Sequence, residues 1–169
     1  MVQDAPLSGV DLPVPLLIKM AKEIETVKCF KIECAQAASK LRKLVVEGGD
    51  AIEGPFDGEE GITLFADLEA GATGNMSSAM IPDLIRPVVL DYLDGEFDIS
   101  EDKYNNILPL INYENRQCGF RATKVIMKEG GVINSDFCRH PISPLEEQTK
   151  AGLIKLVKKY DPIALSWGK

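Results

Sequence analysis

Val27-Lys28-Cys29-Phe30-Lys31-Ile32-Glu33 is an apolar run that predicts a short buried strand with Lys31 at its centre. An ammonium group inside such a strand is costly unless it is paired or neutral. Burial favours the neutral amine, and a neutral lysine can attack a carbonyl carbon to form a Schiff base. The alternative is a lysine that extends its ammonium group to solvent at the strand's end. This run alone favours the alternative, and the rest of the chain reverses that preference.

Apolar strands and amphipathic helices alternate on both sides of the Lys31 strand. Short connections between such elements are typical of parallel strands joined by crossover helices. In the first helix after Lys31, apolar residues recur at spacings of three and four, which is helical periodicity. The expected elements are a strand end at 1–6, a helix at 13–23, the Lys31 strand, a helix at 35–47, a strand at 51–56, a helix at 59–69, a strand at 72–77 and a helix from Pro82.

The second part of the chain shows only helical patterns, expected at 100–112, 116–128 and 145–160. A parallel sheet of three or four strands leaves unpaired edges, and its strands read as buried on both faces. A closed barrel of eight strand–helix units takes about 250 residues, whereas this chain has 169. We therefore predict an α/β fold, the C-terminal half of a (β/α)8 TIM barrel (strands 5/6 to 8) over residues 1–95, followed by a C-terminal helical region over 96–169.

Composition excludes several classes of protein. The formal net charge of −7, with no basic cluster, argues against a nucleic-acid partner. No apolar run approaches the roughly 20 residues that span a bilayer, and no signal peptide is visible, so we expect no membrane partner. Four cysteines without a C-x-x-C pair, and a single histidine, make a zinc site improbable. We expect no metal, no cofactor and a cytoplasmic location, where thiols stay reduced.

Four segments in a fixed order carry a resemblance to a known family. They are Val2 to Gly9, Phe30-Lys31-Ile32-Glu33, Phe56-Asp57-Gly58-Glu59-Glu60 and Glu69-Ala70-Gly71-Ala72-Thr73-Gly74-Asn75. Together they resemble the C-terminal half of the dihydrodipicolinate synthase and N-acetylneuraminate lyase family, over nearly the whole chain. The resemblance implies that Lys31 is the Schiff-base lysine. It also implies that Gly58, Gly74 and Asn75 line the mouth of a barrel, where active sites of this architecture lie.

Two positions depart from the family's pattern. Gln3, which lies 28 residues before Lys31, stands where the family has a catalytic tyrosine, and an amide cannot act as a general acid or base. Ser8 lies near the position of an arginine that binds the second carboxylate in dihydrodipicolinate synthase, and a serine cannot form that ion pair. The chain is more similar to the family's sugar-acid dehydratase branch, in particular to enzymes that dehydrate 2-keto-3-deoxy-L-arabonate.

The resemblance therefore implies a Schiff-base hydro-lyase that acts on a 2-keto-3-deoxy sugar acid. Lys31 would condense with the ketone, a proton would leave C3, and hydroxide would leave C4. Glu33 and Asp4 are candidate acid–base groups, and a structural ion pair is an equal alternative for both. The expected substrate-binding residues are Gln3, Ser8, Glu33, Gly58, Gly74 and Asn75. For the two glycines the alternative role is turn geometry, and for Asn75 it is a buried structural amide.

Two other functions stay open. One is a pyruvate-dependent aldolase or synthase of the same family, and the other is a non-catalytic half-barrel that needs a partner. The family's Thr-Thr pair, which binds the substrate carboxylate, and its first four strands are absent from this sequence. We therefore expect a fragment that is inactive alone. We expect a homo-oligomer, a dimer or tetramer, with a small-molecule 2-keto acid as its ligand.

Overall fold

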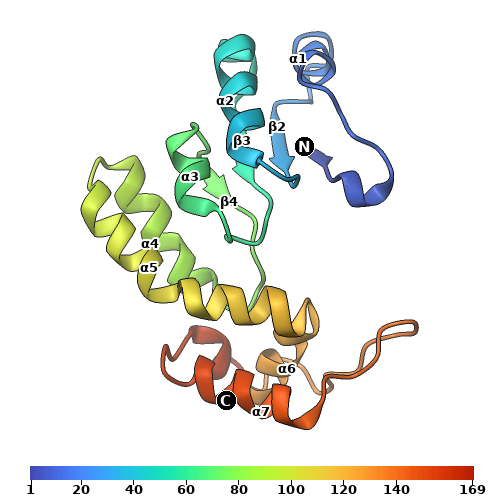
Figure 1. Ribbon diagram of the computed structural model, residues 1–169, viewed down its shortest axis with the longest axis vertical. Helices are drawn as coiled ribbons and strands as arrows, with labels where there is room; N and C mark the ends of the chain where they lie inside the picture. The colour runs from blue at the N-terminus through green and yellow to red at the C-terminus, as the bar shows by residue number, and fades with distance from the viewer. The chain divides into compact units, whose positions relative to one another are not determined.

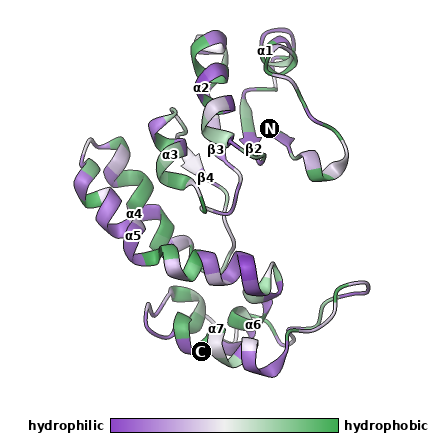
Figure 2. Ribbon diagram, in the orientation of Figure 1, coloured by the Kyte–Doolittle hydropathy of each residue, from purple (hydrophilic) through white to green (hydrophobic).

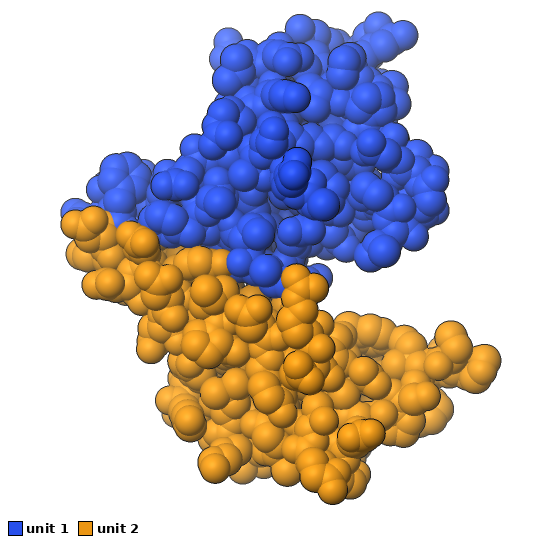
Figure 3. Space-filling model, viewed as in Figure 1, with its two compact units in different colours: residues 1–77, 89–97 blue, residues 78–88, 98–169 orange.

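The computed structural model describes residues 1–169. The chain forms two compact units (Figure 3), unit 1 with residues 1–77 and 89–97, and unit 2 with residues 78–88 and 98–169. Each unit is described by itself below. The domain division at residue 95, expected from the sequence, stays a prediction.

Unit 1 is a parallel β-sheet with crossover helices (Figure 1), as the alternating pattern predicts. The strand order is β1-β2-β3-β4, and each neighbouring pair is parallel. Its elements are β1 (Val2–Asp4), α1 (Val14–Glu23), β2 (Cys29–Ile32), α2 (Ala37–Gly48), β3 (Gly54–Asp57), α3 (Leu64–Glu69) and β4 (Gly74–Asn75). The predicted α/β class with parallel strands is therefore confirmed.

The core of unit 1 lies between the sheet and its helices. Phe30 and Ile32 of β2 are fully buried and belong to one hydrophobic cluster with residues of α1 and α2, among them Leu17, Leu41 and Leu44. Both helices carry hydrophobic and hydrophilic surfaces (Figure 2). Because successive side chains of a strand point to opposite faces, burying Phe30 and Ile32 against the helices directs Lys31 to the other face.

The loop after β3 differs from the sequence prediction. The third helix begins at Leu64 rather than at residue 59. The Asp57 carboxylate accepts a hydrogen bond from the Glu59 N–H at 2.8 Å, which holds the chain in a turn. Glu60 and Gly61 then have positive φ angles of 59° and 84°, which a right-handed helix cannot include. The acidic pair therefore lies in a loop, where the sequence pattern had predicted the first turn of a helix.

Unit 2 is helical, as predicted, and α4 runs across the boundary between the two units. The predicted helix at 116–128 begins only at Arg121, because a π-helical turn precedes it and Gly119 has a φ of 60°. No helix in the structure combines the length and the apolar character that crossing a membrane requires. All four cysteines are free. The main helices are α4 (Pro82–Leu93), α5 (Phe97–Tyr113), α6 (Arg121–Glu129) and α7 (Glu147–Val157).

Candidate functional site

The strand register places three predicted site residues, together with Phe56, in one row across the sheet of unit 1. Gln3 pairs with Lys31, Lys31 with Phe56, and Phe56 with Gly74. Side chains paired across parallel strands lie on the same face, so this row lies on the face opposite the helix-covered core. The sheet therefore brings Gln3 to Lys31 across two strands that are separated by a helix in the sequence.

Lys31 is paired rather than isolated. Its Nζ lies 3.1 Å from Glu33 Oε2, and its side chain is only 16% exposed. Gln3 Nε2 donates a hydrogen bond to the same Glu33 oxygen at 2.5 Å. One carboxylate oxygen thus receives both the ammonium group and the amide, which are strong partners for a carboxylate. Gln3, Lys31 and Glu33, three of the predicted site residues, therefore form one polar group.

Gly58 is required by a close approach and not by a left-handed turn. A Cβ at this position would lie 2.7 Å from the Ile32 carbonyl oxygen and 2.9 Å from Lys31 Cγ. The Gly58 N–H donates to that carbonyl at 2.9 Å, so the loop after β3 is tied to the end of β2. Only a residue without a side chain allows the loop to pass directly against the stem of Lys31.

Gly74 is explained in a similar way by its neighbour in the row. A Cβ on Gly74 would lie 2.4 Å from Cε1 of the Phe56 ring. The ring therefore occupies the space beside Gly74, and its contact is with a protein side chain. Both glycines are therefore explained by close packing, and neither has a positive φ. A role in substrate binding stays a prediction for both.

Asn75 lies on the other face of the sheet. It pairs in register with Asp57, which itself pairs with Ile32, and its Nδ2 donates a short hydrogen bond to Asp57 Oδ2. Its Oδ1 is buried without a hydrogen-bond partner. The structure does not bring Asn75 to the Lys31 group. This geometry favours the buried structural amide over contact with a sugar hydroxyl.

Asp57 and Asp67 form a buried carboxyl pair that the sequence analysis did not identify. Both side chains are fully buried. Burial raises the pKa of Asp67 to about 7 and also raises the pKa of Asp57. The two carboxyls are hydrogen-bonded to each other, and Thr63 Oγ1 donates to Asp67 Oδ2 at 2.7 Å. Like charges in contact cannot both be retained in a buried site, so the pair shares a proton near neutral pH.

Asp4 also lies on the helix-covered face, in register with Ile32. Its carboxylate is fully buried, 2.6 Å from Lys40 Nζ, and its Oδ1 accepts a hydrogen bond from the Leu12 N–H at 3.1 Å. Of the two roles left open for Asp4, this geometry favours the structural ion pair. Ser8 is exposed in a 3₁₀ turn (Pro6–Ser8), and no hydrogen bond joins it to Lys31.

Glu60 is a residue near Lys31 that the sequence analysis placed in a helix. It is half-buried in the loop after β3. Burial raises its pKa, while nearby Lys31 lowers that pKa and Glu33 raises it. Its positive φ is unusual for a residue with a long side chain. The only sequence signal was the family-like turn at 56–60, which did not predict the direction of the side chain.

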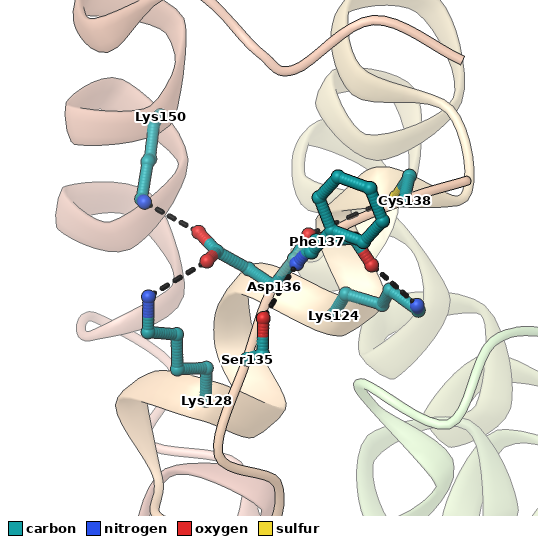
Figure 4. Close-up of polar contacts among 7 residues, drawn as sticks. All are labelled: Lys124, Lys128, Ser135, Asp136, Phe137, Cys138 and Lys150. Carbon is teal, nitrogen blue, oxygen red and sulfur yellow. Dashed lines mark hydrogen bonds and ion pairs between the residues drawn. The ribbon is translucent and has the colours of Figure 1, made fainter. Parts of the chain in front are cut away.

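A separate polar cluster lies in unit 2 (Figure 4). Asp136 lies between Lys128 and Lys150, with Nζ to Oδ distances of 2.7 and 2.5 Å, and the two lysines lower its pKa. Lys124 Nζ donates to the Phe137 carbonyl oxygen at 2.6 Å. These contacts fasten the segment after α6 to both α6 and α7. An adjoining cavity of about 510 Å³ is lined in part by His140, and all its lining residues belong to unit 2.

Comparison with known proteins adds independent evidence. Residues 1–160 match the model of the dihydrodipicolinate synthetase family. L-2-keto-3-deoxyarabonate dehydratase of Azospirillum brasilense is 53% identical over 167 residues, which are 99% of this chain and 54% of that protein. The chain therefore spans about half the length of this relative.

Solved structures show the same fold. Dihydrodipicolinate synthase from Rhodopseudomonas palustris superposes with a TM-score of 0.79 at 24% identity, covering 94% of this chain and 55% of that one. The enzyme from Aquifex aeolicus gives a TM-score of 0.83 at 20% identity, covering 95% and 55%. The parallel sheet of unit 1 is thus part of a barrel fold that these enzymes share. By the match of nearly its whole length to the family model, this chain belongs to the dihydrodipicolinate synthetase family.

Proposed function

We propose that this chain is part of a Schiff-base hydro-lyase that removes water from a 2-keto-3-deoxy sugar acid such as 2-keto-3-deoxy-L-arabonate. The observation that carries the proposal is the 53% identity to a dehydratase of that substrate over nearly the whole chain. The grouping of Lys31 with Glu33 and Gln3 supports it, because imine chemistry needs a lysine beside a group that can accept protons.

The proposed reaction begins at Lys31. Its neutral amine attacks the C2 ketone, and loss of water gives an iminium ion. The iminium withdraws electrons from C3, so a base can remove a C3 proton. Glu33 is suited to this step, because its Oε2 lies 3.1 Å from the nitrogen that becomes the imine. The electron pair then forms the C3–C4 double bond as the hydroxyl leaves C4, and hydrolysis of the imine frees Lys31.

Gln3 has a positioning role in this scheme. It cannot donate or accept a proton in the way a tyrosine can, but its amide holds the Glu33 carboxylate at 2.5 Å. The proton-transfer function therefore falls to carboxylates. Ser8, Gly58 and Gly74 remain proposed contacts for the substrate or for its passage to Lys31, whereas Asn75, on the other face of the sheet, has a structural role in this scheme.

A second candidate is a half-barrel that needs a partner for any activity. The chain spans 54% of its dehydratase relative, which favours a requirement for the other part. A pyruvate-dependent aldolase or synthase is a third candidate, since it uses the same lysine chemistry. We further propose a cytoplasmic homo-oligomer, with residues 1–95 as the barrel part and 96–169 as the helical part.

Borohydride trapping tests the proposal. The chain is assayed alone and joined to the part of the Azospirillum dehydratase that it does not match, which we call the completed enzyme. Incubation with 2-keto-3-deoxy-L-arabonate or pyruvate, then reduction and peptide mass analysis, should place the adduct of the sugar acid on Lys31. Lys28→Arg is the control variant, because Lys28 lies next to the same strand and pairs with Glu53 at 3.8 Å. An adduct on another lysine, or pyruvate condensation without dehydration, would contradict the proposal.

A further inference from the structure

The loop after β3 brings a second carboxyl group toward Lys31 from a different strand. Gly58 lies directly against the Lys31 stem, and its N–H is bonded to the Ile32 carbonyl at 2.9 Å. Two residues later, Glu60 is half-buried and close enough to Lys31 and Glu33 for both to act on it electrostatically. Lys31 thus contacts Glu33, the residue directly after its own strand, and the loop that carries Glu60 passes against its stem.

The two carboxyl groups have different partners. Glu33 Oε2 receives both the Lys31 ammonium group and the Gln3 amide, and these two contacts hold it beside Lys31. Burial, the largest influence on Glu60, acts in the opposite direction and favours a proton on its carboxyl. A carboxyl group held beside the lysine and a second one whose burial favours its proton are suited to the roles of base and acid in one reaction.

The backbone of the loop is fixed so that Glu60 stays in this place. The Asp57 carboxylate accepts the Glu59 N–H at 2.8 Å, and Asp57 is itself held by Asn75. Glu60 keeps a φ of 59°, a left-handed conformation that is unfavourable for a residue with a side chain and persists where the surroundings enforce it. The buried group around Asp57 therefore acts as a support for the Glu60 turn.

We infer that Glu60 is the proton donor to the leaving C4 hydroxyl group, an inference that rests on the proposed dehydration. In this step Glu33 takes the C3 proton, the C3–H electron pair forms the C3–C4 double bond, and the C4–O bond breaks. The departing oxygen takes the proton of the Glu60 carboxyl and leaves as water. Glu60 becomes a carboxylate and regains a proton from solvent before the next turnover. Gln3, at the usual tyrosine position, cannot supply this proton.

A substrate that needs no proton for departure provides the test. Glu60→Gln in the completed enzyme should lower dehydration of 2-keto-3-deoxy-L-arabonate about 10²- to 10⁴-fold. The analogue with fluorine in place of the C4 hydroxyl loses fluoride without protonation, so the variant should eliminate it within about tenfold of the unmodified enzyme. Glu69→Gln, an exposed change on α3, is the matched control and should alter neither rate.

Trapping at Lys31 separates this inference from the function on which it rests. The Glu60→Gln variant should still form the reduced adduct at Lys31, which also shows that it is folded. Equal losses on the hydroxyl and fluoro substrates, no loss on either, or loss of trapping would overturn the role of Glu60. Absence of any adduct in the unmodified completed enzyme would instead overturn the proposed function.

Discussion

Lys31 Nζ lies 3.1 Å from Glu33 Oε2, with Lys31 in β2 and Glu33 directly after Ile32, the last residue of that strand. Residues i and i+2 of a strand point to the same face, so this spacing alone brings them together. The ion pair lowers the cost of holding a lysine that is only 16% exposed. It also places a carboxylate beside the atom at which the proposed imine forms.

We predict that Glu33→Gln separates imine formation from elimination. Without the carboxylate, no base removes the C3 proton, so kcat for dehydration in the completed enzyme should fall about 10²- to 10⁴-fold. Borohydride should still trap the sugar acid on Lys31. The control is Glu53→Gln, which changes an exposed carboxylate whose side chain is 61% accessible. Full activity in Glu33→Gln would show that another group is the base.

We predict that Lys40→Met destabilises the protein strongly. The change leaves the fully buried Asp4 carboxylate without its partner at 2.6 Å. Breaking a buried pair in this way costs about 3–5 kcal/mol in the free energy of unfolding, which urea titration measures. Lys43→Met, at an exposed position of the same helix, should cost less than about 0.5 kcal/mol. The double variant Asp4→Asn/Lys40→Met should recover part of the loss, and a single variant of unchanged stability would contradict the prediction.

We predict that Gly58→Ala harms both stability and activity. The added methyl group would lie 2.7 Å from the Ile32 carbonyl oxygen, a backbone atom that cannot move away without disturbing β2. Forcing an extra carbon into such a site costs about 1–3 kcal/mol. Since the same methyl group would press on Lys31 Cγ, the rate of imine trapping at Lys31 should fall as well. Glu53→Ala, an exposed change directly before β3, should leave the trapping rate unchanged.

The strand–helix order could be predicted from sequence because it depends on local periodicity, and the family resemblance indicated Gln3 and Lys31 as residues of one site. The Glu60 loop could not. An Asp57 side chain capping the Glu59 N–H is a contact that hydrophobic periodicity does not reveal, and two acidic residues before an apolar run are typical of a helix start. Asp67 also escaped notice, because its partner Asp57 lies ten residues earlier and the pair forms only when α3 packs on β3.

We predict a pH dependence of stability from the Asp57 and Asp67 pair. The pKa of Asp67 is raised to about 7 when folded, against about 3.9 when unfolded. The folded state therefore binds more protons between these values, so its stability is greatest at low pH and falls as pH rises from about 4 to about 7. The slope is at most about 1.4 kcal/mol for each pH unit.

Asp67→Asn should remove this slope. The difference in the free energy of unfolding between the variant and the unmodified protein should therefore grow from about pH 4 to about pH 7 and stay constant above it. The contribution of Asp136 to stability depends on pH in the opposite direction. Its two lysines lower its pKa, so its contribution is complete above about 4 and is lost only as pH falls further. Asp136→Asn is therefore the control, with a constant offset between pH 5 and 8 in urea titrations. An unchanged slope in Asp67→Asn would contradict the shared proton.

The last prediction concerns substrate choice and follows from Ser8. The resemblance places Ser8 near the arginine that holds a second carboxylate in dihydrodipicolinate synthase. Without that guanidinium group, the carboxylate of aspartate semialdehyde would enter the pocket unpaired, which is costly. A polyhydroxylated acid instead needs hydroxyl and amide partners, and Gln3 and Ser8 can supply them.

The completed enzyme should therefore dehydrate a 2-keto-3-deoxypentonate and should not condense pyruvate with aspartate semialdehyde. Both rates can be measured on one preparation, with Ser8→Arg as the variant that should favour the aldehyde. If condensation has the higher kcat/KM, the dehydratase assignment is wrong and the imine chemistry of Lys31 stands without it.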